Sequence, residues 1–318
     1  MKDGKYTINE FAKLVGLSKS AIYNYERSGK LPLAQRQARG NTNYRLYTVE
    51  DVQEAKKLLG LPPLISKCRV QLFLNFKGGT GKSVISANYG YRLAQKGIKI
   101  LMVDLDAQGH LTKCLGVNED QFRQTLYDVI IEKVPVQQTI INTSLSTLDL
   151  VPAKLDLSPI ELALMAQHGR EHKLSRILAP LKERYDLIIM DAPPNLGMLN
   201  VNAILASDDL IVPVLADFLS YDGLKILFES LADIEEDLSF RMDRIFILIN
   251  RFNPSHNICV RSRDAIRKNY ADYVLETVIR QNTTVSDATA SQISIFQHAP
   301  SSRAAKDIDQ LVEEIFGF

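Results

Sequence analysis

A glycine-rich segment constrains the fold of this chain more than any other feature of the sequence. It reads Lys77-Gly78-Gly79-Thr80-Gly81-Lys82-Ser83. The apolar run of residues 70–75 precedes it directly, and residues 83–95 carry apolar side chains at helical spacing. A glycine loop that leaves a buried strand and opens a helix surrounds phosphate oxygens with backbone N–H groups, and the helix N-terminus adds positive potential. The segment therefore predicts a phosphate-binding loop, with a purely structural glycine turn as the alternative.

Individual residues of this loop are expected to have separate roles. The Lys82 ammonium is expected to reach the β- and γ-phosphates of a nucleotide, and the Ser83 hydroxyl is expected to bind Mg²⁺. The common form of such loops has glycine where this chain has Phe76, and Lys77 is an additional lysine beside Gly78. The loop thus departs from the common pattern at its first position and carries one lysine more than that pattern requires.

After residue 70 the chain alternates between short apolar runs and amphipathic runs. The predicted strands are residues 70–75, 98–103, 148–151, 187–190, 210–214, 245–249 and 274–278. The predicted helices are residues 83–95, 158–167, 173–181, 223–236 and 262–270. Strands that are apolar throughout and alternate with helices are typical of a parallel sheet covered on both faces. We therefore predict an α/β fold of the P-loop NTPase class, with a mostly parallel sheet flanked by helices.

Two further predicted strands end in carboxylates. Asp104 and Asp106 follow residues 98–103, and Asp191 follows residues 187–190. Ligand sites of open α/β sheets lie at the carboxyl ends of strands, and Mg²⁺ prefers oxygen ligands and keeps several waters. We expect Asp191 to act on Mg²⁺ through water, Asp104 to support the metal and Asp106 to orient the attacking water. A single aspartate there is more often a helix cap, but three beside a phosphate loop favour function.

The first 69 residues differ from the rest in charge. They contain 13 Lys and Arg residues against 6 Asp and Glu residues, a net charge of +7, whereas the remaining residues have a net charge of −6. A small basic segment joined to an acidic body indicates a nucleic-acid-binding module. The pair Pro62-Pro63 cannot continue a helix. We therefore predict a DNA-binding domain over residues 1–60, a linker over 61–69 and a phosphate-loop domain over 70–318.

Two short helices joined by a tight turn are predicted inside the basic segment. Thr7 and Glu10 form a capping-box pattern that starts the first helix, and Ser18 caps the second. A helix-turn-helix of this kind places its second helix in the major groove of DNA. The outward residues of that helix are Lys19, Ser20, Tyr23, Asn24 and Arg27. The basic loop that follows predicts a β-wing whose arginines contact phosphates, namely Arg36, Arg39 and Arg45. A helical bundle that contacts only proteins is the alternative.

The basic segment resembles the MerR-type winged helix-turn-helix. The resemblance rests on residues 22–32, IYNYERSGKLP, and residues 44–52, YRLYTVEDV. It implies that the second helix and the wing bind operator DNA, usually as a dimer. The long dimerising helix that usually follows in that family is not found after residue 60 of this sequence.

Residues 70–318 resemble the deviant Walker-A ATPases, specifically the ParA partition subgroup. The resemblance rests on residues 77–83, Asn88, residues 104–109 with Thr112, residues 125–129, residues 191–197, and residues 276–279 with Asn282. It implies ATP as the nucleotide and a homodimer in which Lys77 crosses to the phosphates of the partner subunit. It also implies that the ATP-bound dimer binds non-specific DNA and that a ParB-like centromere-binding protein stimulates hydrolysis. Asn250 and Arg251 stand where the family contacts adenine, with capping of the chain as the alternative.

The sequence departs from the ParA pattern near two of these motifs. Ala107 stands in place of the usual proline and His110 in place of the usual asparagine, both close to the water-orienting Asp106. Residues 280–284 lack an arginine that the family often has there. A basic helix face is expected nearby, formed by Arg261, Arg263, Arg267 and Lys268.

These features together predict a DNA-partition ATPase, an ATP-gated dimer whose basic head binds its operator for autoregulation. A nucleotide-switched transcription regulator is the alternative. A membrane-positioning ATPase would need a basic amphipathic C-terminus, but residues 307–316 are acidic. The chain has no run of 18 apolar residues, and its three cysteines are too far apart for a disulfide framework or a metal motif. We therefore expect a cytoplasmic, nucleoid-associated protein that does not contact a membrane.

Overall fold

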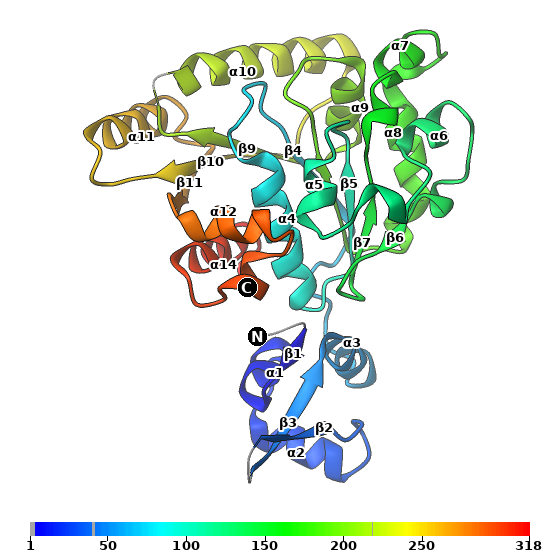
Figure 1. The fold of residues 1–318 in the computed structure, drawn as a ribbon, viewed down its shortest axis with the longest axis vertical. Helices are drawn as coiled ribbons and strands as arrows, with labels where there is room; N and C mark the ends of the chain where they lie inside the picture. The colour runs from blue at the N-terminus through cyan, green and yellow to red at the C-terminus, as the bar shows by residue number, and fades with distance from the viewer. Residues whose placement is uncertain (1–3, 40–41, 218) are drawn as a thin grey trace.

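The computed structural model describes residues 4–39, 42–217 and 219–318, without the side chains of residues 38, 39, 42, 43 and 219. Residues 5–58 form a small head below a larger α/β body (Figure 1). The elements of the head are β1 (Lys5–Tyr6), α1 (Ile8–Val15), α2 (Lys19–Arg27), β2 (Gln35–Arg39), β3 (Thr42–Thr48) and α3 (Val49–Leu58).

The head is a helix-turn-helix with a β-wing, as the sequence predicts. α1 begins at its capping box, in which the Glu10 carboxylate accepts a hydrogen bond from the Thr7 N–H at 2.8 Å. α2 begins after Ser18, whose hydroxyl oxygen accepts from the Ala21 N–H at 3.1 Å. The three strands form an antiparallel sheet of order β1-β3-β2, in which β2 and β3 are the wing. The rings of Phe11 and Tyr47 stack with centroids 4.0 Å apart in the core between these elements.

The body is built on one eight-stranded sheet of order β11-β10-β9-β4-β8-β5-β7-β6. Its strands are β4 (Arg69–Phe73), β5 (Ile100–Asp104), β6 (Ile141–Asn142), β7 (Leu148–Val151), β8 (Leu187–Asp191), β9 (Asp209–Leu215), β10 (Arg244–Phe252) and β11 (Val274–Arg280). Every pairing is parallel except that of the short edge strand β6 with β7. The predicted mostly parallel sheet is therefore confirmed, with β4 near its centre.

Helices cover both faces of this sheet. The longer ones are α4 (Lys82–Gln95), α9 (Met198–Ala206), α10 (Leu219–Leu238), α11 (Asn257–Asn269), α12 (Thr283–Ala290) and α14 (Arg303–Phe316). The shorter ones are α5 (His110–Cys114), α6 (Leu126–Ile130), α7 (Ile160–Met165), α8 (Lys173–Leu178) and α13 (Ile295–His298). Single turns of 3₁₀-helix lie at Glu119–Gln121, Val136–Gln138, Leu155–Leu157, Arg170–His172 and Ala179–Glu183.

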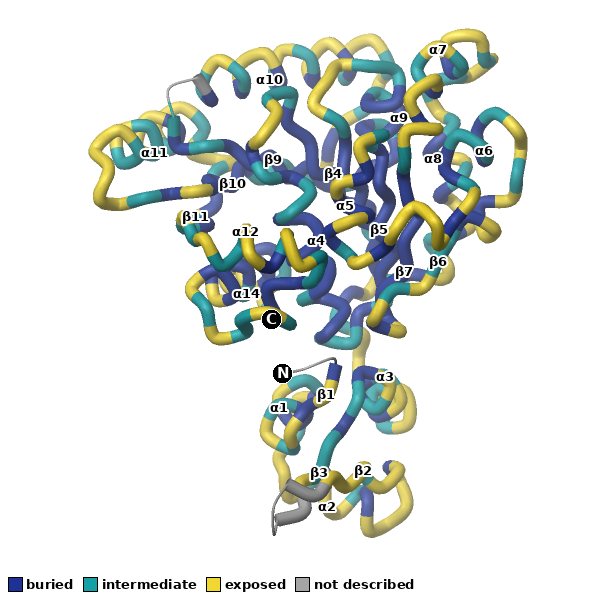
Figure 2. Tube along the Cα trace, in the orientation of Figure 1, coloured by how far each residue is buried: buried dark blue, intermediate teal, exposed yellow. Residues whose placement is uncertain are grey.

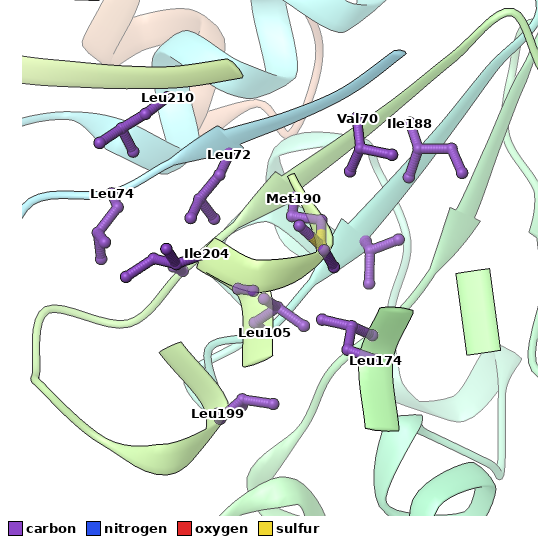
Figure 3. Packing of buried hydrophobic residues seen from close by; sticks show 14 of the residues in the cluster. Val70, Leu72, Leu74, Leu105, Leu174, Ile188, Met190, Leu199, Ile204 and Leu210 are labelled. Atoms are coloured by element: carbon purple, nitrogen blue, oxygen red, sulfur yellow. The ribbon is translucent and has the colours of Figure 1, made fainter. Parts of the chain in front are cut away.

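Two apolar clusters fill the layers between helices and sheet. Leu72 and Leu74 point to the cluster that also contains Leu174 and Leu199 of α8 and α9 (Figure 3). Phe73, which points the opposite way, belongs to the cluster formed with α4 and α14. Figure 2 shows the strands as the most continuously buried part of the body. Successive side chains of β4 point to opposite faces of the sheet. The strand that precedes the phosphate loop is therefore packed by one apolar cluster on each face.

The structure differs from the sequence-based expectations mainly at the ends of elements and in helices that the sequence did not predict, among them α9, α12 and α14. β4 begins at Arg69, one residue inside the predicted linker, and the strand predicted at residues 98–103 is β5, which begins at Ile100. The acidic C-terminal residues form α14, whose apolar face packs in the core with Leu311 and Val312 buried. Within the described residues, none of the helices has the length and apolar character needed to span a membrane.

Candidate functional site

Three of the predicted site segments meet because their strands are neighbours. β8 lies between β4 and β5, and the register places Asp191 beside Phe73 on one side and beside Asp104 on the other. The three strands are parallel, so the phosphate loop after β4 and the two aspartates leave the sheet at the same edge. Segments that lie far apart in the sequence thus form one site.

Buried asparagines hold the phosphate loop from two sides. The Asn75 Oδ1 accepts a hydrogen bond from the Lys77 N–H at 2.9 Å, and its Nδ2 donates to the Pro213 carbonyl at 2.8 Å. The Asn250 Nδ2 donates to the Thr80 carbonyl at 2.7 Å. Because both asparagines are buried, these bonds fix the backbone of the loop. Asn250, predicted to contact adenine, therefore also supports the loop itself.

Gly81 occupies a position in the loop that glycine alone fits. Its φ of +89° lies in the left-handed region, and a Cβ atom at this position would collide with the Asn250 side-chain amide. Gly79 has a φ of +74° as well. These two backbone conformations turn the loop so that α4 begins at Lys82, directly after the glycines.

Lys82 and Asp191 are buried at the centre of the site, and Ser83 is half-buried beside them. Burial lowers the pKa of Lys82, while the charges of Asp191 and Asp106 act in the opposite direction. Burial and the charge of Asp104 raise the pKa of Asp191, although the nearby Ser83 hydroxyl lowers it. Neither carboxylate oxygen of Asp191 has a hydrogen-bond partner of normal geometry among the described residues. A buried carboxylate with two unused oxygens beside a hydroxyl is a donor set suited to a hydrated Mg²⁺ ion.

Asp104 positions the loop that carries Asp106. Its Oδ2 accepts hydrogen bonds from the Thr112 N–H at 2.9 Å and from the Thr112 hydroxyl at 2.7 Å, and its Oδ1 accepts from the Asp106 N–H at 3.1 Å. Burial raises the pKa of Asp104 to about 7 against the effect of these bonds. Both of its oxygens accept hydrogen bonds within the chain, so Asp104 positions this loop, and its support of the metal stays a prediction. Asp106 is half-buried, and its Oδ1 accepts from the Gln108 N–H at 2.9 Å.

Lys77 forms an ion pair with its own subunit that the sequence does not indicate. Its ammonium nitrogen lies 3.0 and 2.8 Å from the two carboxylate oxygens of Asp217, which follows β9. Asp217 also accepts hydrogen bonds from the Ser220 N–H and hydroxyl, both at 2.8 Å. Although partial burial raises the pKa of Asp217, the bonds from Lys77 and Ser220 lower it below its ordinary value. In this conformation Lys77 therefore points to Asp217.

A cavity of about 610 Å³ adjoins the phosphate loop. Its lining includes Gly81, Asn250 and Arg251 together with apolar Ile279 and Val285. Arg251 has a φ of +51°, which is unusual for a residue with a side chain, and its N–H donates to the Asn250 Oδ1 at 2.8 Å. Polar groups at the loop and apolar walls beyond it suit a nucleotide base, and Asn250 and Arg251 both border this space.

The predicted DNA-contacting residues of the head lie on α2 and on the wing. Exposed side chains on α2 include Lys19, Ser20, Tyr23, Asn24 and Arg27. The Arg27 guanidinium donates to the Asn24 Oδ1 at 3.3 Å. Arg36 is exposed on β2, and the side chain of Arg39 lies outside the described part of the chain. The head thus presents a polar and basic face on the helix that the sequence assigns to the major groove.

Arg45, which the sequence predicts to contact phosphates, has a partner inside the head. Its guanidinium pairs with the carboxylate of Glu26, which is buried on α2, and lies 4.5 Å from the centroid of the Tyr23 ring. Glu26 also accepts hydrogen bonds from the Tyr47 hydroxyl at 2.9 Å and from the Ala34 N–H at 3.2 Å. Arg45 therefore ties the wing to α2 and orients Tyr23.

Sequence reasoning did not single out Asn75, Asp217 or Glu26. Asn75 and Asp217 each follow a strand of the site, so their position past an apolar run was a usable signal. Glu26 carries no such signal, because its burial depends on the packing of the wing against α2.

The fold and the site define a P-loop NTPase that carries a helix-turn-helix head. Residues 68–243, more than half of the chain, match the AAA domain family, and residues 7–47 match the MerR family regulatory proteins. The chain is 44% identical over 269 residues to the cell division protein PomZ of Myxococcus xanthus, covering 85% of this chain and 84% of PomZ. It is 33% identical over 241 residues to the sporulation initiation inhibitor protein Soj of Bacillus subtilis, covering 76% and 95% of the two chains.

A solved structure agrees with these sequence matches. The cobyrinic acid a,c-diamide synthase from Mycobacterium smegmatis, with bound ATP analog and magnesium, is similar with a TM-score of 0.69 and 26% identity. The similarity covers 78% of this chain and 94% of the synthase. The chain therefore belongs to the ParA/Soj/MinD-like family of P-loop ATPases, and its N-terminal segment is MerR-like.

Proposed function

We propose that this chain is a DNA-partition ATPase, an ATP-gated homodimer that binds non-specific DNA and segregates a plasmid or chromosome. The observation that carries the proposal is the placement of Lys77. It lies on the phosphate loop, yet its ammonium group is directed to Asp217 rather than to Asp191 at the centre of the site. The Lys77 ammonium group can contact a second subunit once its ion pair with Asp217 is broken.

ATP and Mg²⁺ are the cofactors that this site fits. Lys82 and the N–H groups of the loop would hold the phosphates, and the Ser83 hydroxyl and the free oxygens of Asp191 would hold hydrated Mg²⁺. Mg²⁺ supplies charge neutralisation at the γ-phosphate. Asp106, whose loop is fixed by Asp104, would orient the attacking water. Because that loop is half-exposed, we expect weak hydrolysis until a dimer and a ParB-like partner protein complete the site.

Two basic surfaces would bind DNA in this scheme. The head would bind the operator through α2 and the wing, as its MerR-like match supports. On the body, Arg261 and Lys268 of α11 are exposed, whereas Arg267 is paired with Glu276. Arg280, near the place where ParA relatives often have a DNA-contacting arginine, is paired with buried Asp307. We therefore assign non-specific DNA binding on the body to α11, and we expect the protein on the nucleoid.

The test measures binding of the full chain to a random-sequence duplex with Mg-ATP, with Mg-ADP and without nucleotide. We expect a large increase in affinity with ATP alone. Lys77→Ala should bind ATP yet stay monomeric by light scattering and lose this increase, whereas Lys82→Ala should lose nucleotide affinity itself. Asp106→Ala should dimerise and hydrolyse little.

The outcome separates this proposal from a nucleotide-switched transcription regulator, which the MerR-like head also allows. A regulator would bind a duplex from its own promoter but show no ATP-dependent binding to the random duplex. Equal loss of nucleotide affinity in Lys77→Ala and Lys82→Ala would contradict the shared role of Lys77 between subunits.

A further inference from the structure

The head is docked on the body by direct contacts. Tyr6 belongs to the core of the head and is 1% exposed, yet its hydroxyl donates to the carbonyl of Gln95 in the body. On α3, the Gln53 side-chain amide donates to the Gly97 carbonyl at 3.3 Å. Val52 packs against Gly97, where an added Cβ would lie 3.0 Å from the valine methyl group. A core tyrosine of one domain thus has its buried hydroxyl satisfied by the other.

Further contacts flank this interface. The Glu50 carboxylate, at the start of α3, accepts a hydrogen bond from the Ser146 hydroxyl. Leu61 packs against the core of the head, whereas Ile65 is buried in the body. The predicted linker is therefore anchored at both ends, and only a few residues lie between the two anchors. Figure 1 shows the head meeting the body beneath the lower end of α4.

The head contacts the C-terminal end of the phosphate-loop helix. The last carbonyls of an α-helix have no partner within the helix and carry partial negative charge. In α4 the Gln95 carbonyl is satisfied by Tyr6 of the head, and the Ala94 carbonyl accepts from the Thr147 hydroxyl at 2.9 Å. The other end of the same helix begins at Lys82 in the phosphate loop. A helix of 14 residues, about 21 Å long, therefore has the nucleotide site at one end and the head at the other.

We propose that nucleotide binding and head docking are linked through α4. A nucleotide orders the first turn of α4, and the docked head orders its last turn, so each stabilises the helix for the other. Undocking exposes the Gln95 and Gly97 carbonyls and the Tyr6 hydroxyl to water. The docked and the undocked head are therefore the two states, and the nucleotide shifts the equilibrium between them. Linkage is reciprocal, so undocking of the head lowers the nucleotide affinity of the body. The inference rests on the proposed binding of ATP, but not on partition or on the dimer.

Hydrogen exchange of the full chain tests the linkage. The probe is Mg-ADP at a protein concentration where light scattering shows a monomer, so that contacts between subunits do not contribute. We expect saturating Mg-ADP to slow amide exchange in β1 and α3 by at least about fivefold, the lower end of typical coupling between sites. The triple variant Tyr6→Phe, Glu50→Ala, Gln53→Ala keeps the Tyr6 ring in the head core and should bind Mg-ADP but lose this protection.

The control is Glu54→Ala, an exposed position on the same helix α3, which should keep the full effect. Unchanged exchange in β1 and α3 while nucleotide titration shows saturation would overturn the linkage. Equal protection in the triple variant and in wild type would also overturn it. Failure of nucleotide binding itself would be detected in the titration and would count against the proposed function instead.

Discussion

At the scale of single residues, the two buried carboxylates of the site differ in their hydrogen bonds, and this difference suits them to different roles. Asp104 and Asp191 are both fully buried at the ends of neighbouring strands, and burial raises the pKa of both. Asp104 has its charge offset by hydrogen bonds from Thr112, whereas Asp191 has none of comparable geometry among the described residues. An unsatisfied buried carboxylate lowers the free energy of unfolding. Asp191 therefore destabilises the fold, which is typical of residues that serve function rather than folding.

Asp191→Asn is expected to stabilise the chain in the absence of Mg²⁺ and to impair hydrolysis. The folded-state pKa of Asp191 lies above its unfolded value, so its contribution to stability is fully present below about pH 4 and is lost as pH rises through the folded pKa. The neutral amide removes this loss, and the free energy of unfolding at pH 8 should rise by about 1–3 kcal/mol, the usual cost of an unsatisfied buried polar group. ATP turnover should fall by about 10- to 100-fold, as for other residues that hold a metal through water.

Thermal unfolding of both proteins from pH 5 to pH 8, without Mg²⁺, measures the stability effect. The gap between variant and wild type should widen with pH. Asp120→Asn, an exposed carboxylate on the 3₁₀ turn Glu119–Gln121, serves as the control and should show no such trend. A gap that stays constant across this range would contradict the assignment.

At the scale of elements, the strands inside the sheet were predictable, whereas several helices, short and long, were not. Residues 187–190 read as one apolar run and lie in β8, which ends one residue later at Asp191, because a strand inside a parallel sheet needs apolar side chains on both faces. α9 has apolar residues on all sides and lacks a capping side chain, so it shows neither helical periodicity nor a start signal. The pairings of Lys77 with Asp217 and of Arg45 with Glu26 join distant segments, and no local pattern encodes them.

The wing and α2 are held together by Glu26 and Arg45, so breaking this pair should loosen the head. Arg45→Ala leaves the buried Glu26 carboxylate without its cation, and we expect the head to lose about 2–4 kcal/mol of stability. Arg36→Ala removes an exposed charge on β2 and should change stability by less than about 0.5 kcal/mol while weakening binding to all duplexes.

Hydrogen exchange of α2 and β3 in the full chain separates the two variants. Arg45→Ala should raise exchange in both elements, and Arg36→Ala should leave it unchanged while reducing the salt dependence of DNA binding by about one unit. Equal exchange of α2 and β3 in the two variants would show that Arg45 contributes no more to the stability of the head than Arg36 does.

At the scale of the whole molecule, the head and the nucleotide site lie at opposite ends of α4, and the functions proposed for both need a second copy of the chain. A single head covers one half-site of DNA, because a helix-turn-helix reads one stretch of major groove. Hydrogen bonds from Tyr6 and Gln53 dock the head on the body, so pairing of two bodies would also fix the distance between two heads. Operator binding is therefore expected to depend on the residues that join the bodies.

We expect the full chain with Mg-ATP to bind a duplex from its own promoter, carrying an inverted repeat, more tightly than Lys77→Ala does. Lys77→Ala keeps the head, the docking contacts and Lys82, so it changes only the residue assigned to the partner's phosphates. Two half-sites bound together by a rigid pair of heads gain affinity from effective concentration, about 100-fold or more over one head. Titration of the promoter duplex and of a duplex with one half-site scrambled measures the difference. Wild type should lose this gain on the scrambled duplex and then bind it with the same affinity as Lys77→Ala. Equal affinity of the two proteins for the intact repeat would show that the bodies do not pair the heads.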